Sequence, residues 1–153
     1  MPDILNLGAG TKPMRKGVIN HDRIRHGPHI DVVHDLNVLP WPWEDNSFDH
    51  IVARSVMEHL NIDLVQALDE CWRILRPGGR AYLKVPFYAA DASYSDPTHR
   101  WRYNLQSFDV FVPETKLGTQ YVFYTERKWQ FIKGPRLNTS KTSIHILLEV
   151  RKP

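Results

Sequence analysis

The chain has 153 residues, of which 42% are hydrophobic and 24% charged, and its formal net charge is +3. This size and composition fit one globular domain and exclude a wholly disordered chain. The single cysteine, Cys71, excludes an internal disulfide and a zinc site of paired cysteines, and it suits a reducing compartment. Because no apolar run approaches the ~18 residues that span a bilayer, we expect one soluble, cytoplasmic domain over residues 1–153, without membrane contact.

Short apolar runs alternate with loops along the first part of the chain, which is typical of an α/β domain with a mostly parallel sheet. Strands are predicted over residues 4–7, 18–20, 31–34, 48–53 and 80–85. A helix is predicted over residues 63–75, because its apolar residues fall on one face at helical spacing. Asn61 or Asp63 is expected to cap the start of this helix, and Pro77-Gly78-Gly79 to end it.

The second part of the chain is expected to begin with a polar, aromatic loop over residues 86–102, followed by a short helix over 105–111. Two strands, 121–132 and 143–150, are predicted at the end, and their short connection favours antiparallel pairing. Residues 113–153 carry eight Lys or Arg against three Asp or Glu. For so few charges, a solvated outer face is favoured over a site for a polyanion.

The first predicted strand ends in Gly8-Ala9-Gly10, and glycines at a strand end let the backbone approach a ligand closely. A plain turn explains such a pair of glycines equally well. A dinucleotide-binding loop would have a third glycine three residues later, opening a helix, but position 13 is proline. The loop therefore suits a ligand without phosphates better than a pyrophosphate.

Two aspartates stand at the ends of the next two predicted strands. In doubly wound folds, an acidic residue at the position of Asp22 accepts hydrogen bonds from both hydroxyls of a ribose. The carboxylate of Asp35 and the backbone N–H of Leu36 could bind an adenine in the matching place after the third strand. A turn at Asp22 and a loop cap before Asn37 are the alternatives, and the ligand-binding interpretation is favoured for both aspartates.

The order and spacing of six segments are together specific for one protein family, although no single segment is. The segments are residues 5–10, Asp22, 35–36, 46–49, 56–60 and 75–79. In this arrangement the chain resembles the class I S-adenosylmethionine-dependent methyltransferases, and most closely the methyltransferase-type-11 group, over residues 4–85. The resemblance implies a Rossmann-like α/β fold whose mostly parallel sheet has the order 3-2-1-4-5-7-6 with an antiparallel last strand. It also implies S-adenosyl-L-methionine as cofactor and S-adenosyl-L-homocysteine as product.

The resemblance also assigns roles to residues by position. It gives the methionine part of the cofactor to Gly8, Ala9 and Gly10, the ribose to Asp22, the adenine to Asp35 and Leu36, and the far wall of the site to Arg54 and Ser55. The chain departs from the broader family because it lacks the helices that commonly precede the first strand and cover the active site. A cleft left open in this way would admit a large substrate or be closed by a second chain, for example in a homodimer.

The loop after the fifth strand is where a group acting on the methyl acceptor is expected. Asp96-Pro97-Thr98-His99 resembles a recurrent segment of the type-11 group, so Asp96, His99 and His59 are the candidate catalytic residues. A turn starting at Asp96 and a structural hydrogen bond of His59 are the competing interpretations. The spacing of these three residues is not diagnostic of a metal site, and no metal is predicted.

We therefore expect the chain to transfer a methyl group from S-adenosylmethionine to an unidentified acceptor, with a small molecule favoured over nucleic acid. One alternative is a catalytically silent cofactor-binding module that acts as a scaffold or as the partner of an active subunit. A nicotinamide-dependent oxidoreductase is a second alternative, which the loop at Pro13 disfavours. A nucleic-acid-binding protein that uses the basic C-terminal third is the last.

Overall fold

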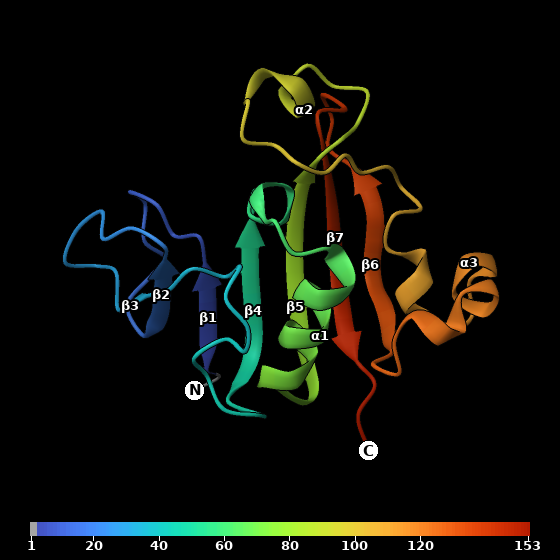
Figure 1. The fold of residues 1–153 in the computed structure, drawn as a ribbon, viewed down its shortest axis with the longest axis horizontal. Coiled ribbons are helices and arrows are strands. Elements are labelled where there is room, and N and C mark those ends of the chain that lie inside the picture. The colour runs from blue at the N-terminus through green and yellow to red at the C-terminus, as the bar shows by residue number, and fades with distance from the viewer. Residues whose placement is uncertain (1–2) are drawn as a thin grey trace.

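The computed structural model describes residues 3–153 and contains a seven-stranded sheet of order β3-β2-β1-β4-β5-β7-β6 (Figure 1). The strands are β1 (Ile4–Leu7), β2 (Val18–Asp22), β3 (Val32–Val33), β4 (Phe48–Arg54), β5 (Leu75–Pro86), β6 (Trp129–Leu137) and β7 (Ser143–Val150). β7 runs antiparallel to both β5 and β6, and the other pairs are parallel. The fold class, the strand order and the antiparallel last strand predicted from the sequence are thus confirmed.

Six short helices complete the described elements. They are the 3-10 turn η1 (Met57–His59), α1 (Leu64–Ile74), α2 (Ala92–Ser95), the 3-10 turn η2 (Asp109–Phe111), α3 (Lys116–Gln120) and the 3-10 turn η3 (Val122–Tyr124). Within residues 3–153, no helix combines the length and the apolar character that crossing a membrane requires.

Helix α1 is the predicted helix, and Asp63 is its cap. The Asp63 carboxylate accepts a hydrogen bond from the backbone N–H of Gln66, while the Gln66 side chain accepts one from the Asp63 N–H. The prediction that Pro77-Gly78-Gly79 ends the helix was wrong, since β5 already begins at Leu75. Leu75 is fully buried and pairs with Phe48, and the register shift that follows takes the three residues out of the ladder.

The segment predicted as a helix over residues 105–111 contains only the single turn η2. The chain then forms α3, whose cap Thr115 accepts a hydrogen bond from the N–H of Gly118. A Cβ at Gly118 would lie 1.9 Å from the carbonyl oxygen of Val112, so only glycine fits this close approach of two backbone segments.

The prediction of a strand over residues 121–132 was wrong in its first half, because β6 begins only at Trp129. Residues before it form the turn η3, and the aromatic side chains there lie at the surface. Phe123 is 74% exposed, and the rings of Tyr121 and Tyr124 stack with centroids 5.0 Å apart. Aromatic residues favour strands where their side chains can pack against the face of a sheet, and here they pack on one another instead.

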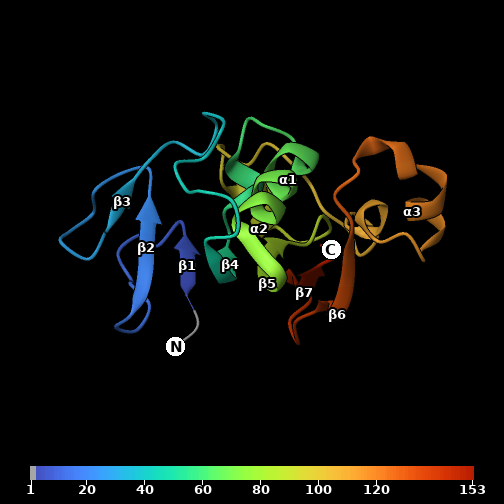
Figure 2. The same ribbon diagram turned by 90° about the horizontal axis from the view of Figure 1, so that it is seen from below.

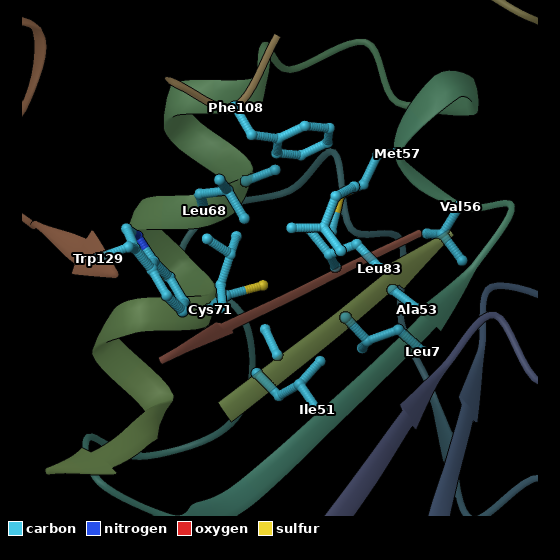
Figure 3. Packing of buried hydrophobic residues seen from close by; sticks show 14 of the residues in the cluster. Leu7, Ile51, Ala53, Val56, Met57, Leu68, Cys71, Leu83, Phe108 and Trp129 are labelled. Atoms are coloured by element: carbon cyan, nitrogen blue, oxygen red, sulfur yellow. The ribbon is translucent and has the colours of Figure 1, made fainter. Parts of the chain in front are cut away.

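Helix α1 lies against one face of the sheet, as Figure 2 shows, and the buried hydrophobic core lies between them. Side chains of α1, β4, β5 and β6 meet there, among them Leu68, Cys71, Ile51, Leu83 and Trp129 (Figure 3). In the described part of the chain, no helix covers the opposite face (Figure 2). Half-exposed, mostly polar side chains occupy that face. Buried and half-exposed residues thus alternate along the strands, as expected of a sheet with one solvent-exposed face.

Candidate active site

The loop after β1 is held against the end of β2 by backbone hydrogen bonds. The N–H of Ala9 donates to the carbonyl of His21 (2.9 Å), and the N–H of Gly10 donates to Oδ2 of Asp22 (2.8 Å). Gly8 and Gly10 both have positive φ, +65° and +58°, a conformation that side chains disfavour. The glycines are therefore required by the path of the loop itself.

Asp22 is buried at the end of β2, and both of its carboxylate oxygens are in use. Oδ2 accepts from Gly10, and Oδ1 accepts from the N–H of Ile24 at 3.2 Å. A carboxylate offers about four lone-pair positions, so two further donors can still be bound. Asp22 keeps the capacity for a pair of hydroxyl donors while it fixes the glycine loop.

A cavity of about 610 Å³, including open solvent at its mouth, lies beyond the carboxyl ends of the strands. It is lined by Gly8, His21, Asp22, Arg23, Asp35, Leu36, Asn37, Ser55, Val56, His59 and Leu60, and we call it the strand-end pocket. This is the edge where open α/β sheets bind ligands.

Most of the predicted cofactor residues meet in the strand-end pocket. Three others lie outside its lining. Ala9 is buried behind the loop, Gly10 faces Asp22, and the guanidinium of exposed Arg54 lies 5.7 Å from the ring of Tyr82 on the uncovered face of the sheet. Ser55 is in the lining and has a φ of +56°, so the chain turns sharply where β4 reaches the pocket.

His21 lines the pocket but was not predicted from the sequence. Its Nε2 is 2.9 Å from the carbonyl oxygen of His34, which can only accept, so Nε2 carries the proton. Burial lowers the pKa of His21, which keeps the ring neutral. Nδ1 is then a buried acceptor without a partner. Its position just before Asp22 on a buried strand gave no signal of a ligand-binding role.

The three predicted catalytic residues come together next to the pocket. The rings of His59 and His99 lie 4.7 Å apart, and Nε2 of His99 is 3.8 Å from Oδ2 of Asp96. Burial, with the nearby His99, lowers the pKa of His59. We call these three residues together with Glu58 the histidine cluster; it adjoins the strand-end pocket through His59, which belongs to both.

Glu58 is a further member of this cluster that was not among the catalytic residues predicted from the sequence. It lies in η1, is fully buried, and neither carboxylate oxygen has a hydrogen-bond partner. Burial raises the pKa of Glu58 to about 7. The position next to His59 hinted at a cleft residue, but its complete burial depends on the packing of the whole domain.

Residues 14–83 match the family model described as "Methyltransferase domain". A protein of Mycolicibacterium smegmatis named "Probable S-adenosylmethionine-dependent methyltransferase" is 38% identical over 71 residues. The matched part is 46% of this chain and 26% of that protein, so the chain spans about a quarter of its relative.

Solved structures resemble the whole chain in fold. The YcgJ protein of Bacillus subtilis has a TM-score of 0.66 at 16% identity, with 99% of this chain and 93% of that chain covered. An S-adenosylmethionine-dependent methyltransferase from Archaeoglobus fulgidus has a TM-score of 0.64 at 14% identity (97% and 86% covered). A Haloferax volcanii protein solved in complex with the Trm112 methyltransferase activator has the same score and identity (97% and 82% covered).

These findings confirm the resemblance predicted from the sequence. Residues 14–83 resemble a methyltransferase domain in sequence, and the fold of the chain resembles that of solved S-adenosylmethionine-dependent methyltransferases. The comparisons support S-adenosyl-L-methionine as the cofactor.

The strand-end pocket fits this cofactor. The carboxylates of Asp22 and Asp35 can accept hydrogen bonds from hydroxyl and amino groups. The apolar side chains of Leu36, Val56 and Leu60 offer surfaces for an adenine ring.

Proposed function

We propose that this domain binds S-adenosylmethionine in the strand-end pocket and transfers its methyl group to an acceptor bound beside the histidine cluster. The observation that supports this most is the meeting of the two regions at His59. One side of that residue is a pocket with carboxylates at the ends of two neighbouring strands, and the other side is a group of imidazoles and carboxylates. A cofactor site and a proton-handling site are the two parts that methyl transfer needs.

Each pocket residue has a proposed task. Asp22 accepts hydrogen bonds from the ribose hydroxyls, and Asp35 accepts one from the adenine amino group, while Leu36 packs on the ring. Gly8, Ala9 and Gly10 bring backbone close to the methionine part, and Ser55 forms the opposite wall; Arg54, whose side chain points elsewhere, acts only through its backbone. When bound, the cofactor supplies an activated methyl group.

The histidine cluster prepares the acceptor. Holding an acceptor in line with the methyl group supplies most of the rate in such transfers, because the reaction needs little other help from the protein. A base contributes only where the acceptor must lose a proton. His59, His99 and Asp96 are the groups placed to orient the acceptor and to receive that proton, since they lie together at the edge of the pocket.

For partners, we propose a small-molecule acceptor and a second protein chain that closes the cleft. The imidazoles and the Asp96 carboxylate beside the pocket offer contacts for a small polar acceptor. The exposed side chains of Tyr94 and Trp101 near the cluster suit a contact with a second copy of this chain. The Haloferax volcanii neighbour, which was solved with an activator protein, offers a precedent for a different partner. Light scattering of the purified chain distinguishes a dimer from a monomer.

Isothermal titration with S-adenosylmethionine and S-adenosylhomocysteine tests the cofactor site. Asp22→Asn should weaken binding about 10- to 100-fold, because hydrogen bonds to a charged group contribute about 1.5–3 kcal/mol. Asp31→Asn is the matched control: Asp31 also accepts a backbone N–H at β2, from Asn20 at 2.7 Å, but does not line the pocket. Equal affinities in both variants and the wild type would refute the proposed role of Asp22.

A valine at Gly8 is a poorer probe. A Cβ there would lie 2.5 Å from Cγ2 of Val56, so the substitution disturbs the loop whether or not a ligand binds.

A further inference from the structure

The carboxylate of Glu58 is fully buried, and the Lys84 charge and the Glu58 backbone N–H act on it without a hydrogen bond of normal geometry. Both oxygens are inaccessible and unbonded in the described structure. Burying a carboxylate without hydrogen bonds or a counter-ion is costly, and such groups in native proteins call for a cation or a proton close by. Oε1 of Glu58 lies 3.9 Å from Nε2 of His59. One ligand atom each of Glu58, His59 and His99 can be chosen so that all three lie within 4.8 Å of one another.

Hydrogen bonds fix which nitrogen of each histidine has a free lone pair. Nδ1 of His99 lies 3.2 Å from the carbonyl oxygen of Ser93, which can only accept, so Nδ1 holds the proton. Nδ1 of His59 lies 2.9 Å from Oγ1 of Thr98. Because the Thr98 hydroxyl donates its own hydrogen to Asp96 (2.7 Å), it accepts from His59. Both histidines therefore present Nε2 as an unprotonated acceptor.

This arrangement is the one that metal-binding histidines use. A ligating imidazole typically donates its other N–H to a carbonyl or, directly or through a hydroxyl, to a carboxylate, which orients the ring and raises its basicity. His99 donates to a backbone carbonyl, and His59 donates to a hydroxyl that is itself bonded to a carboxylate. Two imidazole lone pairs and one carboxyl group thus converge. A proton on Glu58 would satisfy only one of the two imidazoles, whereas a cation between the three groups would satisfy all of them.

We propose that Glu58, His59 and His99 bind one divalent transition-metal ion, for which Zn²⁺ is the best candidate. Two histidines and one carboxylate form the protein ligand set of catalytic zinc sites that keep a position open. Imidazole ligands favour zinc over magnesium or calcium. With Zn–N bonds of about 2.0–2.1 Å, ligand atoms in a tetrahedral site lie about 3.3 Å apart. The three side chains must close by at most about 1.5 Å to reach that geometry.

The position of the ion suggests its task, and this part of the inference rests on the proposed function. His59 also lines the strand-end pocket, so an open metal position faces the space next to the cofactor. A hydroxyl acceptor bound to zinc loses its proton near neutral pH. With Nε2 of both histidines on the ion, the ion takes over from them the activation of the acceptor. The O–H bond breaks and the proton passes to water, and the oxygen lone pair then attacks the methyl carbon as the carbon–sulfur electrons return to sulfur. The acceptor would be a hydroxyl compound.

Metal titration of chelator-treated protein tests the site without any need for activity. Wild type should bind one Zn²⁺ per chain by calorimetry, and Co²⁺ should give the visible absorption bands of a low-symmetry site. Glu58→Gln and His99→Ala should each weaken Zn²⁺ binding at least 10- to 100-fold. His50→Ala is the control: it removes a half-exposed histidine of β4 that lies outside the cluster, and should bind as wild type does.

Two results would overturn the proposal: wild type that binds no Zn²⁺ at one equivalent, or wild-type affinity in both cluster variants. If Glu58→Gln fails to fold, His99→Gln, which keeps a polar group of similar reach, replaces it. Cofactor titration of the same samples separates the two proposals. Loss of zinc binding with intact cofactor binding refutes only the metal site, whereas zinc binding without cofactor binding refutes the proposed function.

Discussion

The strand-end pocket and the histidine cluster meet at His59, yet they are built in different ways. The pocket consists of short segments that each follow a strand, and its glycine loop is tied to Asp22 only 12 residues away. The cluster joins Glu58 in η1 to His99 in the loop after β5, 41 positions later in the sequence, and the N–H of Arg100 donates to the Glu58 carbonyl (2.7 Å). A cofactor site can thus be specified by local sequence, whereas the acceptor side depends on how the second part of the chain packs.

Phe108→Ala should have the largest effect and should separate the two regions. Phe108 is fully buried and stacks on Tyr103. The Tyr103 carbonyl accepts the N–H of Tyr88, at the start of the loop after β5 that carries His99. The substitution should lower the free energy of unfolding by about 3–5 kcal/mol, because it leaves a cavity. Urea denaturation followed by tryptophan fluorescence measures it. Phe123→Ala, at a side chain that is 74% exposed, is the control and should change stability by less than about 0.5 kcal/mol.

At 10 °C, where the Phe108→Ala variant should stay folded, cofactor affinity should be near that of wild type. If the Phe108→Ala variant loses as much free energy of cofactor binding as free energy of unfolding, the pocket is not built independently of the second part of the chain.

Arg73→Ala should have the next largest effect, on the cofactor side. Its guanidinium donates to Glu70 (2.8 Å) and to the carbonyls of Trp41 and Trp43, which join α1 to the segment that follows Leu36. Removal leaves the mostly buried Glu70 carboxylate without its counter-ion, and we expect a loss of about 2–4 kcal/mol of unfolding free energy.

The control for this variant is Arg76→Ala, which removes a half-exposed arginine paired with Asp3 and Asp49 and should have little effect on the denaturation midpoint. Equal destabilisation by both variants would mean that the Arg73 network adds nothing beyond a surface ion pair.

Asp35→Asn should have a moderate effect that is confined to the pocket. Asp35 is exposed, and one of its oxygens accepts the N–H of Asn37 (2.9 Å), a bond that asparagine can keep. Only the acceptor for the adenine amino group weakens, so S-adenosylhomocysteine should bind about 10-fold less tightly with unchanged stability. Asp91→Asn, at an exposed aspartate outside the pocket, is the calorimetric control. Unaltered affinity in Asp35→Asn would place the adenine elsewhere.

The smallest expected effect is a pH dependence of stability from His21. Burial lowers the pKa of His21 in the folded chain, so the unfolded chain binds more protons below its ordinary pKa of 6.5. Stability from this residue is complete above pH 6.5 and declines as the pH falls. His21→Gln should remove part of that decline, at most about 1.4 kcal/mol per pH unit. Denaturation midpoints of both proteins between pH 7.5 and 5 measure it, and parallel curves would contradict the assignment.

The parts predicted from the sequence are those that local chemistry specifies. The capping box at Asp63, the strand ending in Gly8-Ala9-Gly10 and the acidic end of β2 are each readable within a few residues. The strand order followed from the resemblance, because propensity alone does not determine topology.

The parts that were missed depend on tertiary packing. Aromatic residues 121–124 have the composition of a strand but lie at the surface, and nothing local distinguishes the two. Likewise, the free lone pairs of His21 and of the histidine cluster follow from hydrogen bonds to His34, Ser93 and Thr98. Those partners lie at distances along the chain that no motif spacing encodes.

A crystal structure of the chain with S-adenosylhomocysteine and Zn²⁺ would show whether the cofactor lies in the strand-end pocket. We expect ribose hydroxyls within hydrogen-bond distance of Asp22, the adenine against Leu36, and the sulfur on the side of the pocket that faces His59. A ligand bound away from the carboxyl ends of β1, β2 and β4, or an adenine distant from Leu36, would contradict the claim that this edge of the sheet is the methyltransferase site.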